Sequence, residues 1–137
     1  MTDQFALDPQ LNADTVPAFS LKLSDVLLMN DARFPWLILV PRRPNLVEIV
    51  DLGPEDRGQL MEEIALTSNV LKAATRCDKL NVGAIGIAVR QLHIHVIART
   101  LADAVWPRPV WGVGEAVAYR LEERHRLLAR IKAAVPT

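Results

Sequence analysis

The chain has 137 residues, half of them hydrophobic, which is enough to bury the core of one domain, and we expect a single domain over residues 1–137. Its 16 Lys and Arg balance 16 Asp and Glu, which argues against the long-range attraction that basic proteins exert on nucleic acid or anionic membranes. A single cysteine, Cys77, excludes an intrachain disulfide and favours a reducing, cytoplasmic location.

Residues 1–20 show no sustained hydrophobic period and are expected to form an N-terminal arm with at most a short helical turn. Phe5, Leu7 and Leu11 would anchor this arm. The first ten residues carry acidic groups and a proline where a secretory signal has a basic start and an apolar block. The longest apolar run, Trp36–Val40, is far shorter than a membrane-spanning helix. We therefore expect neither a secretory signal nor a membrane partner.

Two apolar runs, Val26–Met29 and Trp36–Val40, predict a β-hairpin, because the segment between them opens with Asn30 and closes with Pro35. Further on, Gly53-Pro54 and the carboxylates that follow are typical of a helix N-terminus. Apolar residues then recur at helical spacing, and they predict a helix to about Arg76 with Gly58 as its weak point. The residues of this stripe are Leu60, Ile64, Thr67, Leu71 and Ala74.

Two more strands are predicted at Leu80–Ile85 and Gln91–Arg99, and a second helix from about Glu115 to Val135. Residues 106–112 hold too many prolines for regular structure. The second helix would place Val117, Leu121, Leu128 and Ile131 on one side. Together the elements predict an α+β fold: an antiparallel sheet of about five strands, one long helix, and a C-terminal segment with its own helix over residues 100–137.

The strand predicted at Gln91–Arg99 places its polar side chains on one face. Apolar residues such as Leu92 and Ile94 occupy one parity, and Gln91, His93 and His95 occupy the other. Successive side chains of a strand point to opposite faces, so both imidazoles and the glutamine would share the side away from the apolar core.

Three interpretations of this pair of histidines stay open. They could lie on a solvated strand face, or they could share a zinc ion. A zinc site needs three or four ligands, and the remaining histidine, His125, lies on a predicted helix without suitable spacing, so no metal site is predicted. In the third interpretation one neutral imidazole attacks phosphorus and its neighbour donates a proton to the leaving group.

The segment that runs from Asn81 through Gly86 to Arg99 resembles the signature of the histidine triad (HIT) family, His-φ-His-φ-His-φ-φ, where φ is hydrophobic. Its central part reads Gln91-Leu92-His93-Ile94-His95-Val96-Ile97. The likeness extends upstream to Leu27–Asn30 and Trp36–Arg42 and to the helix after Leu52, so it spans residues 20 to 100. Parity, hydrophobic spacing and flanking segments agree, which makes the motif specific.

The resemblance implies that His93 attacks the α-phosphate of a nucleotide derivative and forms a nucleotidyl-imidazole, which water then hydrolyses. His95 would contact the phosphate, and Gln91 stands where the first histidine of the triad orients its neighbours. The substrate-binding positions that it implies are Asn30 near the ribose, Asn81 at the phosphate and Gly86, where main-chain N–H groups can approach an anion.

The family further implies a purine nucleotide that carries a second group on its α-phosphate, a homodimer, and no metal or other cofactor. The sequence departs from the family pattern at Gln91, whose amide cannot titrate, and at Trp36, where many relatives have a histidine. Ile87 and Ala88 stand where relatives often carry a polar residue and a serine. These departures favour an alternative: a nucleotide-binding module with little or no catalytic activity.

Overall fold

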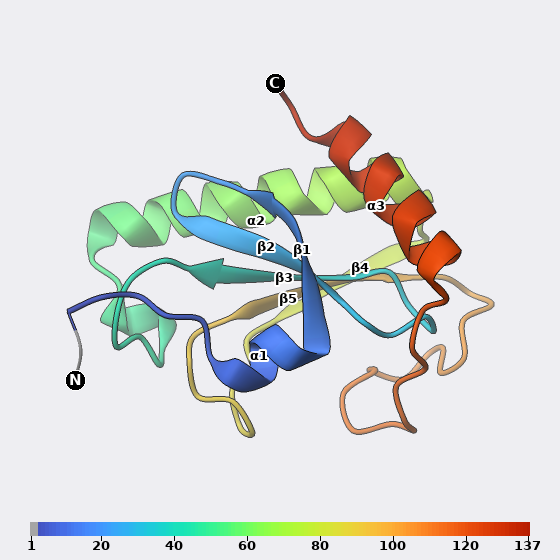
Figure 1. The fold of residues 1–137 in the computed structure, drawn as a ribbon, viewed down its shortest axis with the longest axis horizontal. Helices are drawn as coiled ribbons and strands as arrows, with labels where there is room; N and C mark the ends of the chain where they lie inside the picture. The colour runs from blue at the N-terminus through green and yellow to red at the C-terminus, as the bar shows by residue number, and fades with distance from the viewer. Residues whose placement is uncertain (1–2) are drawn as a thin grey trace.

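The computed structural model describes residues 3–137 as a five-stranded antiparallel sheet in the order β1-β2-β3-β5-β4, with helices on its faces (Figure 1). The elements are α1 (Pro9–Asp14), β1 (Thr15–Ser20), β2 (Ser24–Met29), β3 (Trp36–Pro41), the 3-10 turn η1 (Ile49–Asp51), α2 (Pro54–Thr75), β4 (Lys79–Gly83), β5 (Ile94–Arg99) and α3 (Leu121–Ala134). The α+β fold predicted from the sequence is confirmed.

The two faces of the sheet have different covers. Helices α2 and α3 lie over one face, whereas α1 and the long loop between β5 and α3 lie on the other (Figure 1). Strands β3 and β5 are central, and both are buried along their whole length. The continuous apolar run of β3 follows from this position, since its side chains meet a core on either side.

Each face carries its own hydrophobic cluster. Under α2 and α3, apolar side chains of β2, β3 and β5 pack on both helices, and this cluster includes Leu28, Leu37, Leu39, Ile94, Val96, Leu60, Leu71 and Ile131. On the opposite face the side chains of alternate parity pack beneath the loop, and this cluster includes Leu11, Phe34, Trp36, Ile38, Ile97, Val105 and Val110. The alternation predicted for the histidine strand is therefore confirmed, but both of its faces are covered.

Helix α2 agrees with the sequence prediction at both ends. Pro54 occupies its first turn, and Arg76 ends it in the left-handed conformation with φ of 53°. The buried carboxylate of Glu63 accepts hydrogen bonds from the main-chain N–H groups of Leu23 and Ser24, at 2.7 and 2.9 Å. The helix thus holds the turn between β1 and β2 against the core.

The N-terminal arm is more ordered than predicted, because residues 15–20 form the edge strand β1. Pro17 lacks a main-chain N–H group, which disfavours it inside a sheet. An edge strand tolerates this loss, and the register shifts beside Pro17, between Pro17 and Phe19. Helix α1 begins at Pro9 after Asp8, whose side chain accepts a hydrogen bond from the N–H of Gln10.

The predicted second helix starts too early. Residues 115–120 are not helical, because the turn at residues 30–32 holds their main chain: Ala32 donates to the carbonyl of Val117, and Asn30 accepts from the N–H of Tyr119. Val117 and Leu121 are consequently exposed, whereas Ile131 is buried and Leu128 packs on the core as predicted, and Leu127 is buried as well. The predicted strand Gln91–Arg99 is likewise shorter, since Leu92 bonds to Leu46 outside the sheet.

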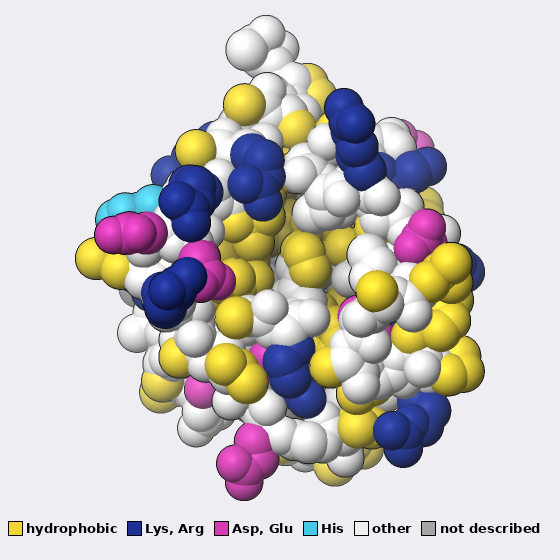
Figure 2. Space-filling view, turned by 90° about the vertical axis from the view of Figure 1, so that its right-hand side faces the viewer, with side chains coloured by type: hydrophobic (Ala, Val, Ile, Leu, Met, Phe, Trp, Pro, Cys, Tyr) yellow, Lys and Arg dark blue, Asp and Glu magenta, His cyan; other side chains and the backbone are white. Residues whose placement is uncertain are grey.

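The face seen in Figure 2 carries Lys and Arg side chains among Asp, Glu and hydrophobic ones, without a continuous patch of one charge. This mixed surface agrees with the balanced composition of the chain. In the part of the chain that the structure describes, no helix combines the length and the apolar character that crossing a membrane requires.

Candidate functional site

The two histidines lie side by side at the start of β5. His93 immediately precedes the strand and His95 is its second residue, with ring centroids 4.8 Å apart in an edge-to-face arrangement. Their residues are only 6% and 5% exposed. The interpretation of a solvated strand face is therefore wrong, because the loop after β5 covers this side of the sheet.

The main chain selects the tautomer of the neutral His93 ring. Its Nδ1 lies 2.7 Å from the carbonyl oxygen of Gln91. A carbonyl only accepts hydrogen bonds, so Nδ1 carries the proton of the neutral ring and Nε2 holds a lone pair. Among residues 3–137 no hydrogen bond engages that second nitrogen. The ring therefore has the tautomer that a nucleophile needs.

His95 has the opposite tautomer. The indole N–H of Trp36 donates to His95 Nδ1 at 3.0 Å, so the neutral ring carries its proton on Nε2. Burial, followed by the proximity of His93, lowers the pKa of His95 to about 4. The ring is neutral at pH 7, and its Nε2–H can donate a hydrogen bond to phosphate.

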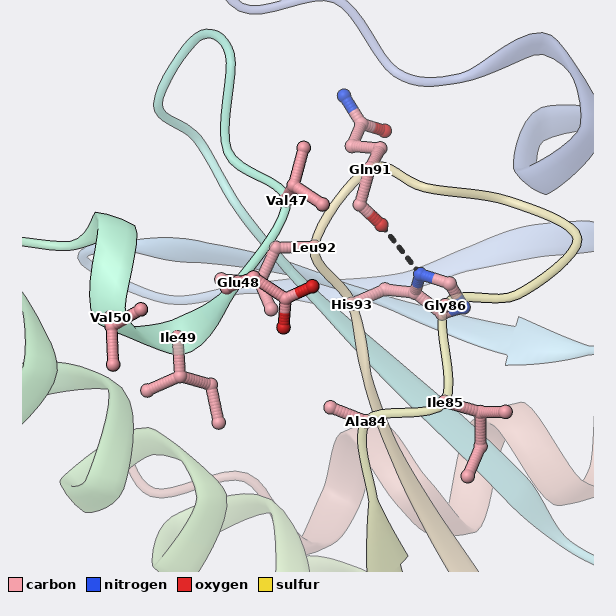
Figure 3. Close-up of a pocket in the computed structure, with 10 residues that line it drawn as sticks. All are labelled: Val47, Glu48, Ile49, Val50, Ala84, Ile85, Gly86, Gln91, Leu92 and His93. Carbon is pink, nitrogen blue, oxygen red and sulfur yellow. Dashed lines mark hydrogen bonds between the residues drawn. The ribbon is translucent and has the colours of Figure 1, made fainter.

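A pocket of about 250 Å³ opens beside His93. It is lined by residues from the loop before α2, from the loop after β4 and from the segment that leads into β5: Val47, Glu48, Ile49, Val50, Ala84, Ile85, Gly86, Gln91, Leu92 and His93. Gly86 has a φ of 65°, a conformation that few other residues adopt without strain. Figure 3 shows the carboxylate of Glu48 pointing into this pocket, toward the side on which His93 lies.

A second pocket of about 350 Å³ lies on the other side of the histidine pair. Trp36 and Trp111 line it, and both rings also contact the His95 ring, with centroids 5.6 and 5.5 Å away. Arg33 lines it as well, held by the buried carboxylate of Asp31. Burial raises the pKa of Asp31, but the hydrogen bonds from Arg33 and from the N–H of Val117 outweigh it and lower the pKa overall.

Gln91 acts through its main chain and not through its side chain at His93. The amide points away from the imidazole (Figure 3), donates to the carbonyl of Ala6 at 2.8 Å and accepts from the N–H of Asp8 at 2.8 Å. The side-chain orienting role implied by the family pattern is therefore replaced by the carbonyl bond to His93. The amide instead fastens the N-terminal arm to the loop before β5.

The structure does not bring the two asparagines into the His93 pocket. Asn30 lines the second pocket and bonds to the N–H of Tyr119. Asn81 accepts a hydrogen bond from Arg99 at 2.8 Å and lines a separate hollow with Trp111. Of the positions singled out from the sequence, His93, His95, Gln91 and Gly86 gather at one place, and Asn30 and Asn81 lie beside it.

The described residues, 3–137, include no group of three or more His, Cys, Asp or Glu side chains that could hold a metal ion. His125 lies on α3, away from β5. The pair His93 and His95 thus lacks the further protein ligands that a zinc site needs.

Sequence reasoning missed Glu48 and the contact of Trp111 with His95. Glu48 belongs to a short stretch without periodicity, and no local signal indicates that it faces a residue 45 positions later. Trp111 follows a proline-rich segment, where no periodicity indicates which way its side chain faces.

The family model of the HIT domain matches residues 10–101. A histidine triad protein from Bradyrhizobium japonicum is 46% identical, covers 97% of this chain and 99% of its own, and superposes with a TM-score of 0.94. Histidine triad proteins from Sinorhizobium meliloti (47% identity, 95% and 96% coverage, TM-score 0.92) and Marinobacter aquaeolei (39%, 96% and 96%, 0.93) are similarly close. No protein with a curated description matches the chain.

Proposed function

Because this chain belongs to the HIT domain family, we propose that it binds nucleotides and hydrolyses or transfers a nucleotidyl group through His93. One observation carries the catalytic part of the proposal: the hydrogen bond between His93 Nδ1 and the Gln91 carbonyl leaves the lone pair on Nε2, beside a pocket. An imidazole in this state is a competent nucleophile toward phosphorus at neutral pH.

The proposed reaction has two steps. His93 Nε2 forms a bond to the α-phosphorus, the bond from phosphorus to the second group breaks, and that group departs with the electron pair and takes a proton from water. A water molecule then forms a bond to phosphorus and gives up a proton to the solvent, which offsets the proton taken in the first step. The bond to Nε2 breaks with its electron pair returning to the ring, and a nucleoside monophosphate is released with the His93 ring restored. If an alcohol or amine replaces water in the second step, the result is transfer.

Two features support stabilisation of the charged phosphate. The Nε2–H of His95 is a neutral donor held in place by Trp36, and a fixed donor in a buried site stabilises developing negative charge. Gly86 lines the pocket with a φ of 65°, and a backbone of this kind allows main-chain N–H groups to approach an anion. Neither feature needs a cationic side chain or a metal ion.

The decisive experiment combines turnover and trapping. Adenylyl and guanylyl conjugates should be cleaved by the wild-type protein, and His93→Ala should lower kcat/KM by at least about 1,000-fold, since the nucleophile is gone. Mass spectrometry of rapidly quenched samples should detect a nucleotidyl group on the peptide that contains His93. Wild-type activity in the His93→Ala protein, folded as judged by circular dichroism, would refute the proposal.

A second candidate is a nucleotide-binding module without efficient turnover. Ile87 is 85% exposed where relatives often carry a polar residue, and the neutral His95 ring is a weaker acid toward the leaving group than an imidazolium would be. This candidate predicts binding of purine nucleotides by calorimetry together with no cleavage of any conjugate. A homodimer, also part of the proposal, is checked by sedimentation equilibrium in the same buffers.

A further inference from the structure

The His93 pocket contains a negative group and no positive side chain. Glu48 points into it (Figure 3), whereas the other lining residues are apolar apart from Gln91, Gly86 and His93. Among the described residues, no Lys or Arg lines this pocket. The second pocket is lined by Arg33, which pairs with Asp31, and by Asp14. The two pockets therefore differ in whether a cationic side chain lines them.

The position of Glu48 is set by the main chain around it. The carboxylate of Asp51 accepts hydrogen bonds from the N–H groups of Val47 and Glu48, at 3.1 and 2.8 Å. These bonds close the turn before α2, and the Glu48 side chain completes a capping box with the main-chain N–H of Asp51. A carboxylate beside a pocket acts on the charge of whatever enters it.

We propose that Glu48 determines specificity, by selecting conjugates whose second group, the one that leaves from the α-phosphate, is cationic or neutral and by rejecting those in which it is anionic. The inference rests on the proposed function, and it requires the leaving group to occupy the His93 pocket. The aromatic rings of Trp36 and Trp111 suit the second pocket to a base. The apolar walls and single carboxylate of the His93 pocket suit an aminoalkyl group.

The proposed specificity also depends on repulsion between Glu48 and an anionic leaving group. An anionic group in the pocket would lie near the Glu48 carboxylate without any cation to compensate it, and like charges at such distances exclude the wrong ligand. Glu48 is exposed to solvent on one side, so screening limits the effect, and we expect a discrimination of about tenfold to 100-fold.

The test uses three nucleoside 5′-phosphoramidates with the same P–N bond and different amines: 1,3-diaminopropane, propylamine and β-alanine. They place a cation, a neutral chain and an anion in the pocket, and adenosine and guanosine series cover both purines. The wild-type protein should give kcat/KM in the order cation, neutral, anion. Glu48→Gln, which keeps the shape of the side chain, should reduce the cation-to-anion ratio to below about threefold.

Two controls make the result specific. Glu55→Gln removes an exposed carboxylate from the first turn of α2, outside the pocket, and should leave the ratio unchanged. Raising the salt concentration should lower the wild-type ratio and not that of Glu48→Gln. An unchanged ratio in Glu48→Gln, with turnover that depends on His93, overturns this inference alone. Absence of turnover with every conjugate overturns the proposed function and the inference with it.

Discussion

Strand β5 carries polar side chains at both ends of one face, and the two ends differ in how completely these side chains are hydrogen-bonded. At its start, His93 and His95 each use one ring nitrogen in a hydrogen bond and leave the other without a partner among the described residues. At its end, Arg99 donates to both carboxylate oxygens of Asp103 and to Asn81, with the rings of Phe34 and Trp106 on its faces.

The difference separates a polar group that stabilises the fold from one that is available for chemistry. Arg99 is 2% exposed and paired, and it lowers the pKa of Asp103 to about 2, which binds the loop after β5 to the sheet. That loop in turn covers the histidines. The buried ion pair of Arg99 and Asp103 thus holds the loop after β5 over the two histidine rings, each of which has one ring nitrogen without a hydrogen bond.

The largest effect on stability is expected at the paired end. Arg99→Met should lower the free energy of unfolding by about 3–5 kcal/mol, because it leaves the buried carboxylate of Asp103 without its counter-ion. Urea denaturation measures the change. Arg108→Met, at an exposed position of the same loop, should stay within about 0.5 kcal/mol of the wild type. Similar losses for both variants would contradict the comparison.

The next largest effect is the pH dependence of stability that arises from His95. Below pH 6.5 the unfolded chain protonates His95, whereas the folded protein does so only near its pKa of about 4. Stability should therefore fall by about 3 kcal/mol as the pH drops from 6.5 to 4, since the unfolded state binds the extra proton. His95→Gln should lose this part of the pH dependence.

Asp103 provides an internal reference for that experiment. Its pKa is lowered, as that of His95 is, so its contribution is present above the pKa of about 3.8 of a free aspartate and is lost as the pH falls toward 2. The two pH windows are distinct. An equal slope between pH 6.5 and 4.5 in the wild type and His95→Gln would show that His95 is not held neutral.

The smallest expected change in the free energy of unfolding comes from a substitution that alters only backbone freedom. Gly58 lies in α2, and a Cβ added there would meet nothing within 4 Å. Gly58→Ala should raise the free energy of unfolding by about 0.5–1 kcal/mol, because alanine loses less conformational freedom than glycine in a helix. It should leave kcat/KM unchanged. A loss of stability would indicate that this face of α2 is covered in solution.

Much of the fold could be predicted because its signals are local. The helix over residues 54–75, the hairpin of β2 and β3 and the alternation along β5 follow from spacing, proline and glycine. The strand β1 and the start of α3 could not be predicted. Both depend on partners elsewhere: β1 on pairing with β2, and residues 115–120 on hydrogen bonds to the turn at residues 30–32.

The features of the candidate site likewise fall into those that the sequence predicts and those that depend on distant contacts. The sequence by itself determined that two imidazoles share one face of a strand beside a glycine-containing loop, since a two-residue repeat is a property of the extended chain. Only the tertiary structure decided which nitrogen of each ring carries the proton, that Gln91 contributes its carbonyl, and that Glu48 faces the pocket. These features come from contacts between segments far apart in sequence, whose distances no local pattern encodes.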